Sequence, residues 1–366
     1  MSIHPSALAA KVSRAIGLSN DRLLTLVVLI QGLVNARTVN LTHLAGTFHG
    51  PAKLSSNYRR LQRFFQYVRL DGDWLAKTLV TLLRLKPPYR LCLDRTNWRV
   101  GRKDVNLLVL CIVTRRARIP VLWHILDHRG SSNTKQRQAL LVRFMALFGK
   151  KSIKLLLADL EFIGKQWFEF LVENDIHFAI RVSERFHVCL DDGYEGPLSR
   201  LLRSASSRHR LMKAKGRFIG MQERFDAALS FGTTRLRDGS WLIVATDLAP
   251  RKALNAYKQR WQIECFFGDT KTRGFNMEDT RLTQPDKLAV LLAIVALAIA
   301  WALACATAVK PKGDIARASH GYRRKSWFRM GLDTLRHWIF VKPDAALNRW
   351  NTIWHRIPTL NEPRVV

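Results

Sequence analysis

Three acidic residues occupy positions where an α/β protein usually presents its functional groups. Asp94 and Asp159 each follow a strand-like apolar run, and Glu264 lies on a predicted helix. Carboxylates that converge at strand ends repel one another unless a cation neutralises them. Their oxygens are the ligands that Mg²⁺ and Mn²⁺ prefer. Two such ions, typically about 3.5 to 4 Å apart, support in-line phosphoryl transfer, so the three acids predict a two-metal site of this kind.

The stretch from Tyr257 to Lys271 is predicted to form the helix that carries the third acid. Pro250 precedes it as a start signal, and Gly274 ends it. Four of its side chains share one face, within about 60° of each other at about 100° per residue: Tyr257, Arg260, Glu264 and Lys271. That face would place a carboxylate among donors able to hold a phosphate. The alternative is a solvated face with an ordinary i,i+4 ion pair.

Two motifs connect these acids to a known family. They are Asp-Arg-Thr-Asn-Trp at 94–98 and Tyr-x2-Arg-x3-Glu-x6-Lys at 257–271. With them, the sequence resembles the DDE transposases of bacterial insertion sequences, specifically the IS-four group, over about residues 41–335. The resemblance implies an RNase H-like fold and two Mg²⁺ or Mn²⁺ ions held by Asp94, Asp159 and Glu264. One departure is Leu160, where the family has a basic residue next to a phosphate.

The resemblance also implies a reaction and its partners. Water would first nick the transposon end, and the freed 3′-hydroxyl would then attack the opposite strand or target DNA. We therefore predict a DNA transposase that binds terminal repeats of an insertion sequence and performs cut-and-paste transposition. Its partners would be double-stranded DNA, as transposon ends and target, and a second copy of the chain in a homodimer paired on those ends. The alternatives are an RNase H-like nuclease without strand transfer and a catalytically inactive DNA-binding protein.

The charge of the chain is consistent with a polyanionic partner. Its 60 Lys and Arg residues exceed its 28 acidic residues and give a net charge of +32. Such an excess favours nucleic acid over a membrane surface as the partner, although a merely soluble basic protein is the alternative. The five cysteines are scattered in mostly apolar runs, which is typical of reduced core residues. We expect no secretory signal and a cytoplasmic, nucleoid-associated protein.

A long apolar stretch raises the question of a membrane span. Residues Leu288 to Ala306 are apolar at all 19 positions, which is long enough to cross a bilayer. Eight of the 19 are alanines, which lowers the hydrophobicity. We predict a buried core helix and no membrane partner.

The chain divides into three predicted regions. Residues 1–88 show helical periodicity and form a predicted DNA-binding domain, and Pro87-Pro88 ends it. Residues 89–306 form the catalytic domain, interrupted by a β-rich insertion at 184–240, and residues 307–366 form a small helical C-terminal region. Strands alternate with helices in the catalytic domain, which indicates an α/β fold with a mixed sheet. Its predicted strands are 89–94, 106–114, 119–127, 153–158 and 177–182, and its predicted helices are 134–148 and 163–173.

Several further side chains are predicted to contact DNA. Arg59, Arg60 and Arg63 lie on a predicted helix in a segment with a local charge of +9, from twelve basic and three acidic residues. This helix could follow phosphates or enter a major groove, or it could simply face solvent. By resemblance, Trp241 would stack on an extruded base, the alternative being an aromatic of an edge strand. Because they share the face of Glu264, Tyr257, Arg260 and Lys271 are also predicted to contact phosphates of the transposon end beside the scissile bond.

Overall fold

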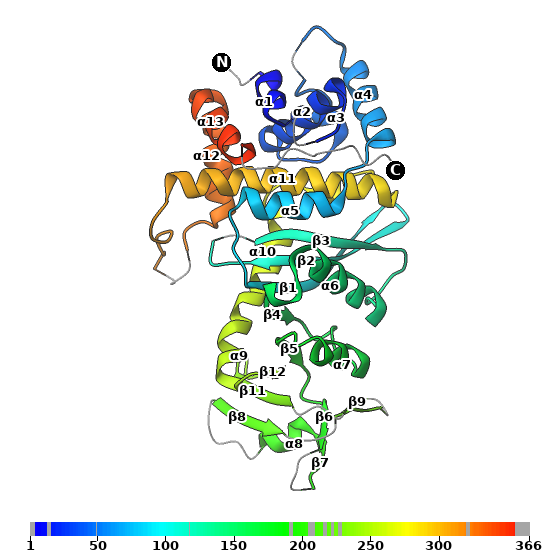
Figure 1. Cartoon of the computed structure of the whole chain (residues 1–366), viewed down its shortest axis with the longest axis vertical. Coiled ribbons are helices and arrows are strands. Elements are labelled where there is room, and N and C mark those ends of the chain that lie inside the picture. The colour runs from blue at the N-terminus through cyan, green and yellow to red at the C-terminus, as the bar shows by residue number, and fades with distance from the viewer. Residues whose placement is uncertain are drawn as a thin grey trace. The chain divides into compact units, whose positions relative to one another are not determined.

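The computed structural model shows a mixed α/β protein (Figure 1). It describes residues 4–12, 16–48, 50–116, 118–189, 193–203, 209–214, 218–220, 223–225, 229–319 and 323–355. The chain forms two compact units. Unit 1 combines residues 1–86, 97–105 and 265–366, and unit 2 combines residues 87–96 and 106–264.

Unit 2 contains most of an eight-stranded sheet of order β3-β2-β1-β4-β5-β12-β11-β8. The strands are β1 (Tyr89–Val100), β2 (Lys103–Val113), β3 (Arg118–Leu126), β4 (Ile153–Ala158), β5 (Phe178–Val182), β8 (His209–Ala214), β11 (Leu229–Arg235) and β12 (Trp241–Thr246). β4 pairs in parallel with β1 and β5, whereas β12 pairs antiparallel with β5 and β11. The hairpin end at 97–105 belongs to unit 1. This mixed sheet is compatible with the RNase H-like fold that the resemblance implies.

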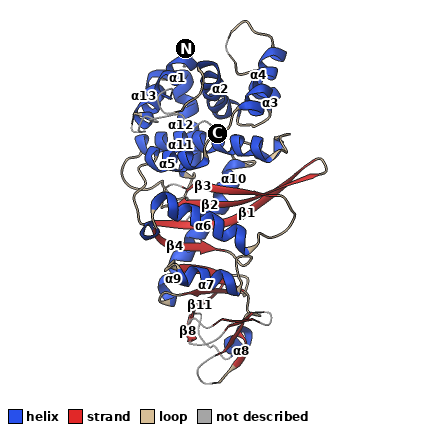
Figure 2. Cartoon of the chain, turned by 45° about the vertical axis from the view of Figure 1, so that its right-hand side comes forward, coloured by secondary structure: helices blue, strands red, loops and turns tan. Residues whose placement is uncertain are grey.

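Helices pack on this sheet, and they alternate with its strands along the chain. α6 (Thr134–Phe148) begins with a capping box in which Asn133 and Gln136 satisfy each other's backbone donors. α6 lies beside α7 (Lys165–Glu173), and both cover the sheet (Figure 2). α9 (Pro250–Tyr257) packs on β5, β11 and β12. The predicted bounds of α6 and β4 are those of the structure, because the capping box fixes the start of α6 and β4 is a short, mostly apolar run that ends before Asp159.

Two predicted elements differ from the structure. β1 continues six residues past Asp94, because its hairpin with β2 extends beyond the end of β4. The predicted helix 257–271 is instead α9, a 3-10 turn at Lys258–Arg260, and α10 (Trp261–Thr270).

Within the predicted β-rich insertion 184–240, β8 and β11 extend the main sheet. Smaller elements in that region are β6 (His187–Cys189), β7 (Glu195–Pro197), α8 (Leu198–Arg203), β9 (Phe218–Gly220) and β10 (Glu223–Phe225).

Unit 1 is helical and is built around α11 (Pro285–Val309) (Figure 1). The other helices are α1 (Pro5–Val12), α2 (Asn20–Ala36), α3 (Leu41–Ala45), α4 (Leu54–Tyr67), α5 (Gly72–Leu82), α12 (Trp327–Val341) and α13 (Pro343–Trp354). α11 is the one helix in the described ranges that is long and apolar enough to cross a membrane, and 94% of its most apolar window is buried in the protein. It contacts α2, α4, α5, α12 and α13, as expected for a core helix.

The C-terminal helices belong to the same core as the N-terminal ones. Trp350 of α13 donates a hydrogen bond from Nε1 to the carbonyl of Leu8 in α1 at 2.9 Å. Gly331 lets α12 approach α11 closely, since a Cβ there would lie 1.9 Å from the carbonyl oxygen of Ala302. The predicted division into 1–88, 89–306 and 307–366 stays a prediction, and the compact units group the two end regions together.

Candidate active site

Two of the predicted acids follow neighbouring parallel strands. Leu93 of β1 is opposite Ala158 of β4 in the register, so Asp94 and Asp159 come next on each strand. The stretches before the two aspartates are mostly apolar and buried in the sheet, and parallel strands present their carboxyl ends at one edge. Asp94 lies within β1 rather than at its end, but it is the first residue beyond the pairing with β4.

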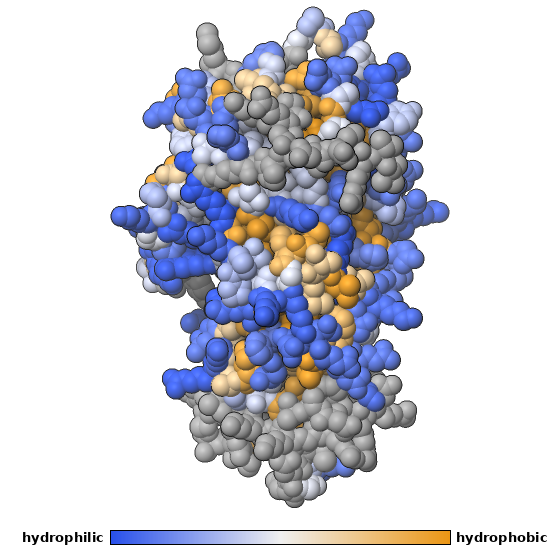
Figure 3. Space-filling model, in the orientation of Figure 1, coloured by the Kyte–Doolittle hydropathy of each residue, from blue (hydrophilic) through white to orange (hydrophobic). Residues whose placement is uncertain are grey.

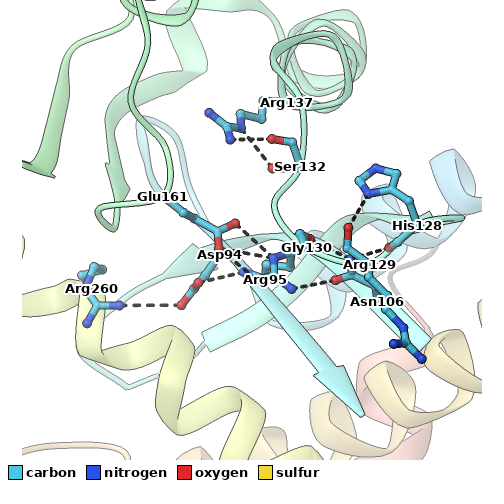
Figure 4. A network of polar contacts seen from close by, with 10 residues as sticks. All are labelled: Asp94, Arg95, Asn106, His128, Arg129, Gly130, Ser132, Arg137, Glu161 and Arg260. Carbon is cyan, nitrogen blue, oxygen red and sulfur yellow. Dashed lines mark hydrogen bonds and ion pairs between the residues drawn. The ribbon is translucent and has the colours of Figure 1, made fainter. Parts of the chain in front are cut away.

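Arg260 lies between the three acids. Its Nη1 is 3.6 Å from Asp94 Oδ2 and 3.6 Å from Asp159 Oδ2. Its Nη2 forms a close hydrogen bond with Glu264 Oε1, one turn further along the chain. Figure 4 shows the guanidinium directed at Asp94. The arginine is only 9% exposed. The three carboxylates therefore share one buried cation, and all four residues belong to unit 2.

The electrostatics of the site follow from this burial. Burial raises the pKa of Asp94 from its ordinary 3.8 to about 7, although the Arg95 amide and the Arg260 guanidinium lower it. Burial lowers the pKa of Arg260, but the Tyr257 hydroxyl and the carboxylates of Asp159 and Glu264 outweigh it and the net pKa is raised. The site is therefore short of positive charge, and its arginine stays protonated.

Tyr257 supports the second aspartate. Its hydroxyl donates to Asp159 Oδ1 at 3.2 Å, and the Arg260 guanidinium lies 5.7 Å from the centre of its ring. The side chain is 6% exposed, and burial raises the pKa of its hydroxyl. Tyr257 is thus a neutral donor that orients Asp159.

A second polar network, which the sequence did not lead us to expect, fixes the residues beside the two aspartates (Figure 4). Arg95 Nε lies 3.2 Å from each oxygen of Glu161, and its Nη1 donates to Asn106 Oδ1 at 3.0 Å. Asn106 is 2% exposed, and its Nδ2 donates to the carbonyls of His128 and Gly130 at 2.9 and 3.0 Å. The residue after Asp94 is therefore tied to the second residue after Asp159. The only signal for this network in the sequence is that Arg95 and Glu161 lie within two residues of Asp94 and Asp159.

Another buried arginine holds the loop before α6. Arg137 is 5% exposed, and it donates from Nε to Ser132 Oγ at 3.0 Å and from Nη2 to the Ser132 carbonyl at 2.5 Å. Its guanidinium lies 5.1 Å from the ring centre of Phe162, in the segment after β4. Loops at this edge of the sheet are thus held by side-chain contacts.

The donor set suits a hard divalent cation in kind. Three carboxylates face one positive charge, and the most buried of them has a raised pKa, which is the environment that a bound cation would relieve. Among the described residues, no three His, Cys, Asp or Glu side chains are close enough to hold a metal ion in this conformation. The acids converge on the guanidinium of Arg260 instead of on one another.

The comparison with known families agrees with this arrangement. The model of the transposase DDE domain matches residues 85–301, a range that includes all three acids and both motifs. The chain belongs to the transposase DDE domain family. No protein of curated function matches it at a significant level. Members of this family act on DNA with the help of divalent metal ions, so the DDE domain makes this chain a DNA-acting transposase.

Lys271 and Trp241, two further predicted DNA contacts, have protein partners in the structure. Lys271, in unit 1, lies 2.8 Å from Glu278 Oε1 and donates to the Asn97 carbonyl at 3.2 Å. Trp241 begins β12, which lies inside the sheet and is not an edge strand. The guanidinium of Arg235 covers its ring at 4.9 Å from the centre. The DNA-contact roles of both residues stay predictions.

The three arginines of α4 differ from one another. Arg60 donates from Nε to Thr25 Oγ1 at 2.9 Å and from Nη2 to the Asp21 carbonyl at 3.1 Å, so it fastens α4 to α2. Arg59 and Arg63 are exposed. Only the last two present their charge to solvent.

We predict that Arg95 and Glu161 are energetically coupled. Their side chains are 18% and 23% exposed, so replacing either partner by Ala should lower the free energy of unfolding by about 2 kcal/mol, and the pair should show a coupling energy above about 1 kcal/mol. Arg95→Lys keeps the charge but loses the paired geometry. It should slow strand nicking by about tenfold through misplacement of Asp94, with DNA binding unchanged. The measurements are a double-mutant cycle by urea unfolding and a nicking assay.

The Lys150–Asp175 pair is the matched control, because its side chains are 45% and 85% exposed and surface pairs contribute little. A coupling energy for Arg95 and Glu161 no larger than that of the control would contradict the prediction.

Proposed function

We propose that this chain is the transposase of a bacterial insertion sequence of the IS-four group, which cleaves the terminal repeats of its element and joins them to target DNA. The observation that carries this is the convergence of Asp94, Asp159 and Glu264 on one buried cation. Carboxylates so placed suit phosphoryl transfer better than binding alone. The Asp-Arg-Thr-Asn-Trp and Tyr-x2-Arg-x3-Glu-x6-Lys motifs support the assignment to this group.

Asp94, Asp159 and Glu264 would hold two Mg²⁺ or Mn²⁺ ions, which when bound supply an activated attacking oxygen and a stabilised leaving oxygen. The chain itself keeps the acids in place. Tyr257 orients Asp159, and Arg260 offsets the repulsion among the three acids. The network of Arg95, Glu161 and Asn106 fixes the backbone beside both aspartates. This rigidity matters because small displacements of reacting groups slow a reaction strongly.

The partners follow from the charge and the reaction. A net charge of +32 supports binding to transposon ends and to target DNA. Two ends must be brought together for transposition, so we infer a homodimer assembled on them. An RNase H-like core is supported by the mixed sheet with parallel β1, β4 and β5. The free cysteines among the described residues, Cys92, Cys111, Cys265 and Cys305, suit a cytoplasmic, nucleoid-associated protein.

The test separates transposition from its alternatives. Purified chain is incubated with Mg²⁺, a plasmid target and labelled duplexes taken from the DNA that flanks its coding sequence. A transposase should nick at one defined position and then give labelled products joined to the plasmid. Nicked but never joined DNA would identify a nuclease without strand transfer. Bound but intact DNA would identify an inactive DNA-binding protein, and either result overturns the proposal.

A further inference from the structure

Helix α4 in unit 1 carries two neighbouring rows of polar side chains on its outer surface. One row has the spacing i, i+4, i+8 and consists of Tyr58, Gln62 and Gln66, and the adjacent row consists of Arg59, Arg63 and Tyr67. Residues four apart lie above one another on a helix. The opposite face is buried through Asn57, Leu61, Phe64 and Phe65, so the helix is fixed in orientation. The surface around α4 is mainly hydrophilic (Figure 3).

A cleft of about 460 Å³ runs along this surface. We call it the α4 cleft, and the lining residues that matter are Tyr58, Gln62, Arg63, Gln66, Arg281 and Lys287. The last two come from the segment that leads into α11 and from its first turn. All of these residues belong to unit 1, so two segments about 220 residues apart in the sequence form one site.

The charges of the cleft favour an anion. Arg63, Arg281 and Lys287 line it, and within the described residues their side chains make no hydrogen bond or ion pair. Arg60 on the same helix is different, because the packing of α4 on α2 occupies its guanidinium. The one acid of the lining, Asp279, accepts from Thr38 Oγ1 at 3.4 Å. Arg63 and Arg281 are exposed and Lys287 is half-buried, so three cations lie beside a single carboxylate in the cleft.

The two glutamines supply a different kind of chemistry. A side-chain amide carries both donors and an acceptor, and it can pair with the N6 and N7 atoms of adenine in the major groove. Gln62 and Gln66 are exposed, one turn apart, and a separation of four residues, about 6 Å along the helix, places the two amides about two base-pair steps apart. An α-helix about 10 to 12 Å wide fits a major groove about 12 Å wide. Arginine and lysine on both sides would then meet the phosphates.

We propose that α4 reads the base sequence of duplex DNA in the major groove, with Gln62 and Gln66 contacting base edges and Arg63, Arg281 and Lys287 contacting phosphates. This inference rests on the proposed function, since terminal repeats must be told apart from other DNA. It assigns base selectivity to two neutral side chains and affinity to the cations of the α4 cleft.

The test uses the full-length chain in EDTA, so that binding is measured without cleavage. A pool of 30-base-pair duplexes with random sequence is selected for binding to the wild type, to Gln62→Ala, to Gln66→Ala and to the double variant. Alanine is the best helix former, so α4 should remain folded. The wild type should enrich one motif, and each glutamine variant should lose about tenfold of its preference at one or two adjacent base pairs. Gln284→Ala, an exposed amide at the start of α11, should select the wild-type motif.

The cations are tested by the salt dependence of binding. Arg63→Ala, Arg281→Ala and Lys287→Ala should each weaken binding to the selected duplex and to a scrambled duplex equally, and each should reduce the slope of log K against log salt by about 1. Lys77→Ala, an exposed lysine on α5 outside the cleft, should leave that slope unchanged.

The possible outcomes separate this inference from the proposed function. If the wild type selects a motif that the double glutamine variant also selects unchanged, the inference is overturned and the transposase proposal stands. Stronger binding to single-stranded than to double-stranded pools would overturn the reading of duplex DNA by α4. If the wild type selects no motif and nicks no DNA, the proposed function fails, and the inference fails with it.

Discussion

Replacing any one of Asp94, Asp159 and Glu264 by its amide is expected to abolish strand nicking and leave DNA binding intact. An amide keeps the size of the side chain but removes the negative charge that holds a divalent cation. Loss of one ligand from a two-metal site should cost several kcal/mol of transition-state stabilisation, which corresponds to a rate at least about a thousandfold lower. The measurement is nicking of labelled end DNA with Mg²⁺, alongside binding of the same DNA in EDTA.

Asp175→Asn is the matched control, because Asp175 is an exposed acid of unit 2 that pairs with Lys150. It should nick at the wild-type rate. Near-normal nicking by Asp94→Asn, Asp159→Asn or Glu264→Gln would remove that residue from the catalytic set.

The Asp94 variant should also be more stable than the wild type at high pH. In the wild type, the pKa of Asp94 in the folded chain is about 7, above its ordinary 3.8. Between these pH values the folded chain therefore binds more protons than the unfolded chain. Its contribution to the free energy of unfolding therefore falls as pH rises from about 4 to about 7 and stays low above that. A tenfold change in the ionisation constant corresponds to about 1.4 kcal/mol. The free energy of unfolding of Asp94→Asn should therefore exceed that of the wild type by at most about 4 kcal/mol at pH 8 and by almost nothing at pH 4. Urea unfolding in EDTA at both pH values measures this, and a variant less stable than the wild type at pH 8 would contradict it.

Arg260→Ala is expected to be the most destabilising single change in the site. It would leave three partly buried carboxylates without their shared cation, and removal of one partner from a buried ion pair costs about 3 to 5 kcal/mol. Since Arg260 lowers the pKa of Asp94, its loss should raise that pKa further. The penalty should therefore be larger at pH 8 than at pH 5, where Asp94 can take up a proton.

The control for Arg260 is Arg90→Ala, because Arg90 donates to the neutral Oε1 of Gln259 at 3.1 Å. Its loss should cost less and should show no difference between the two pH values. MgCl₂ should raise the melting temperature of Arg260→Ala more than that of the wild type, because the carboxylates freed from Arg260 can bind the cation. Equal penalties for Arg260→Ala and Arg90→Ala at pH 8 would contradict this account.

The strands that lead to Asp94 and Asp159 could be predicted from the sequence, but the surroundings of the three acids could not. Asp94 and Asp159 follow apolar runs whose strand character is clear from the sequence. The helical spacing placed Arg260 on the face of Glu264. It could not show that this face turns inward to the acids, because burial depends on the sheet against which the helix packs. Arg95 and Glu161 are 66 positions apart, and local periodicity carries no information on such a pair.

Contacts between distant parts of the sequence also explain why the grouping of the two end regions in one unit could not be predicted. Composition and periodicity suggested a helical region at each end of the chain. In the structure, Trp327 and Trp350 are each 1% exposed, and the helices that carry them pack with α11. Contacts between the first and last helices depend on the whole chain, so no local pattern revealed them.

The last helices of unit 1 pack on α11 and α1, and this affects how the unit assembles on the ribosome. The N-terminal helices emerge first, yet α12 and α13, which cover α11, are made last. Until they leave the exit tunnel, the long apolar helix α11 lacks the part of its cover that α12 and α13 supply, and exposed apolar surface of this kind is bound by chaperones and attacked by proteases. A chain that stops before Trp327 is therefore expected to be degraded and not to accumulate, so only a complete transposase would persist in the cell.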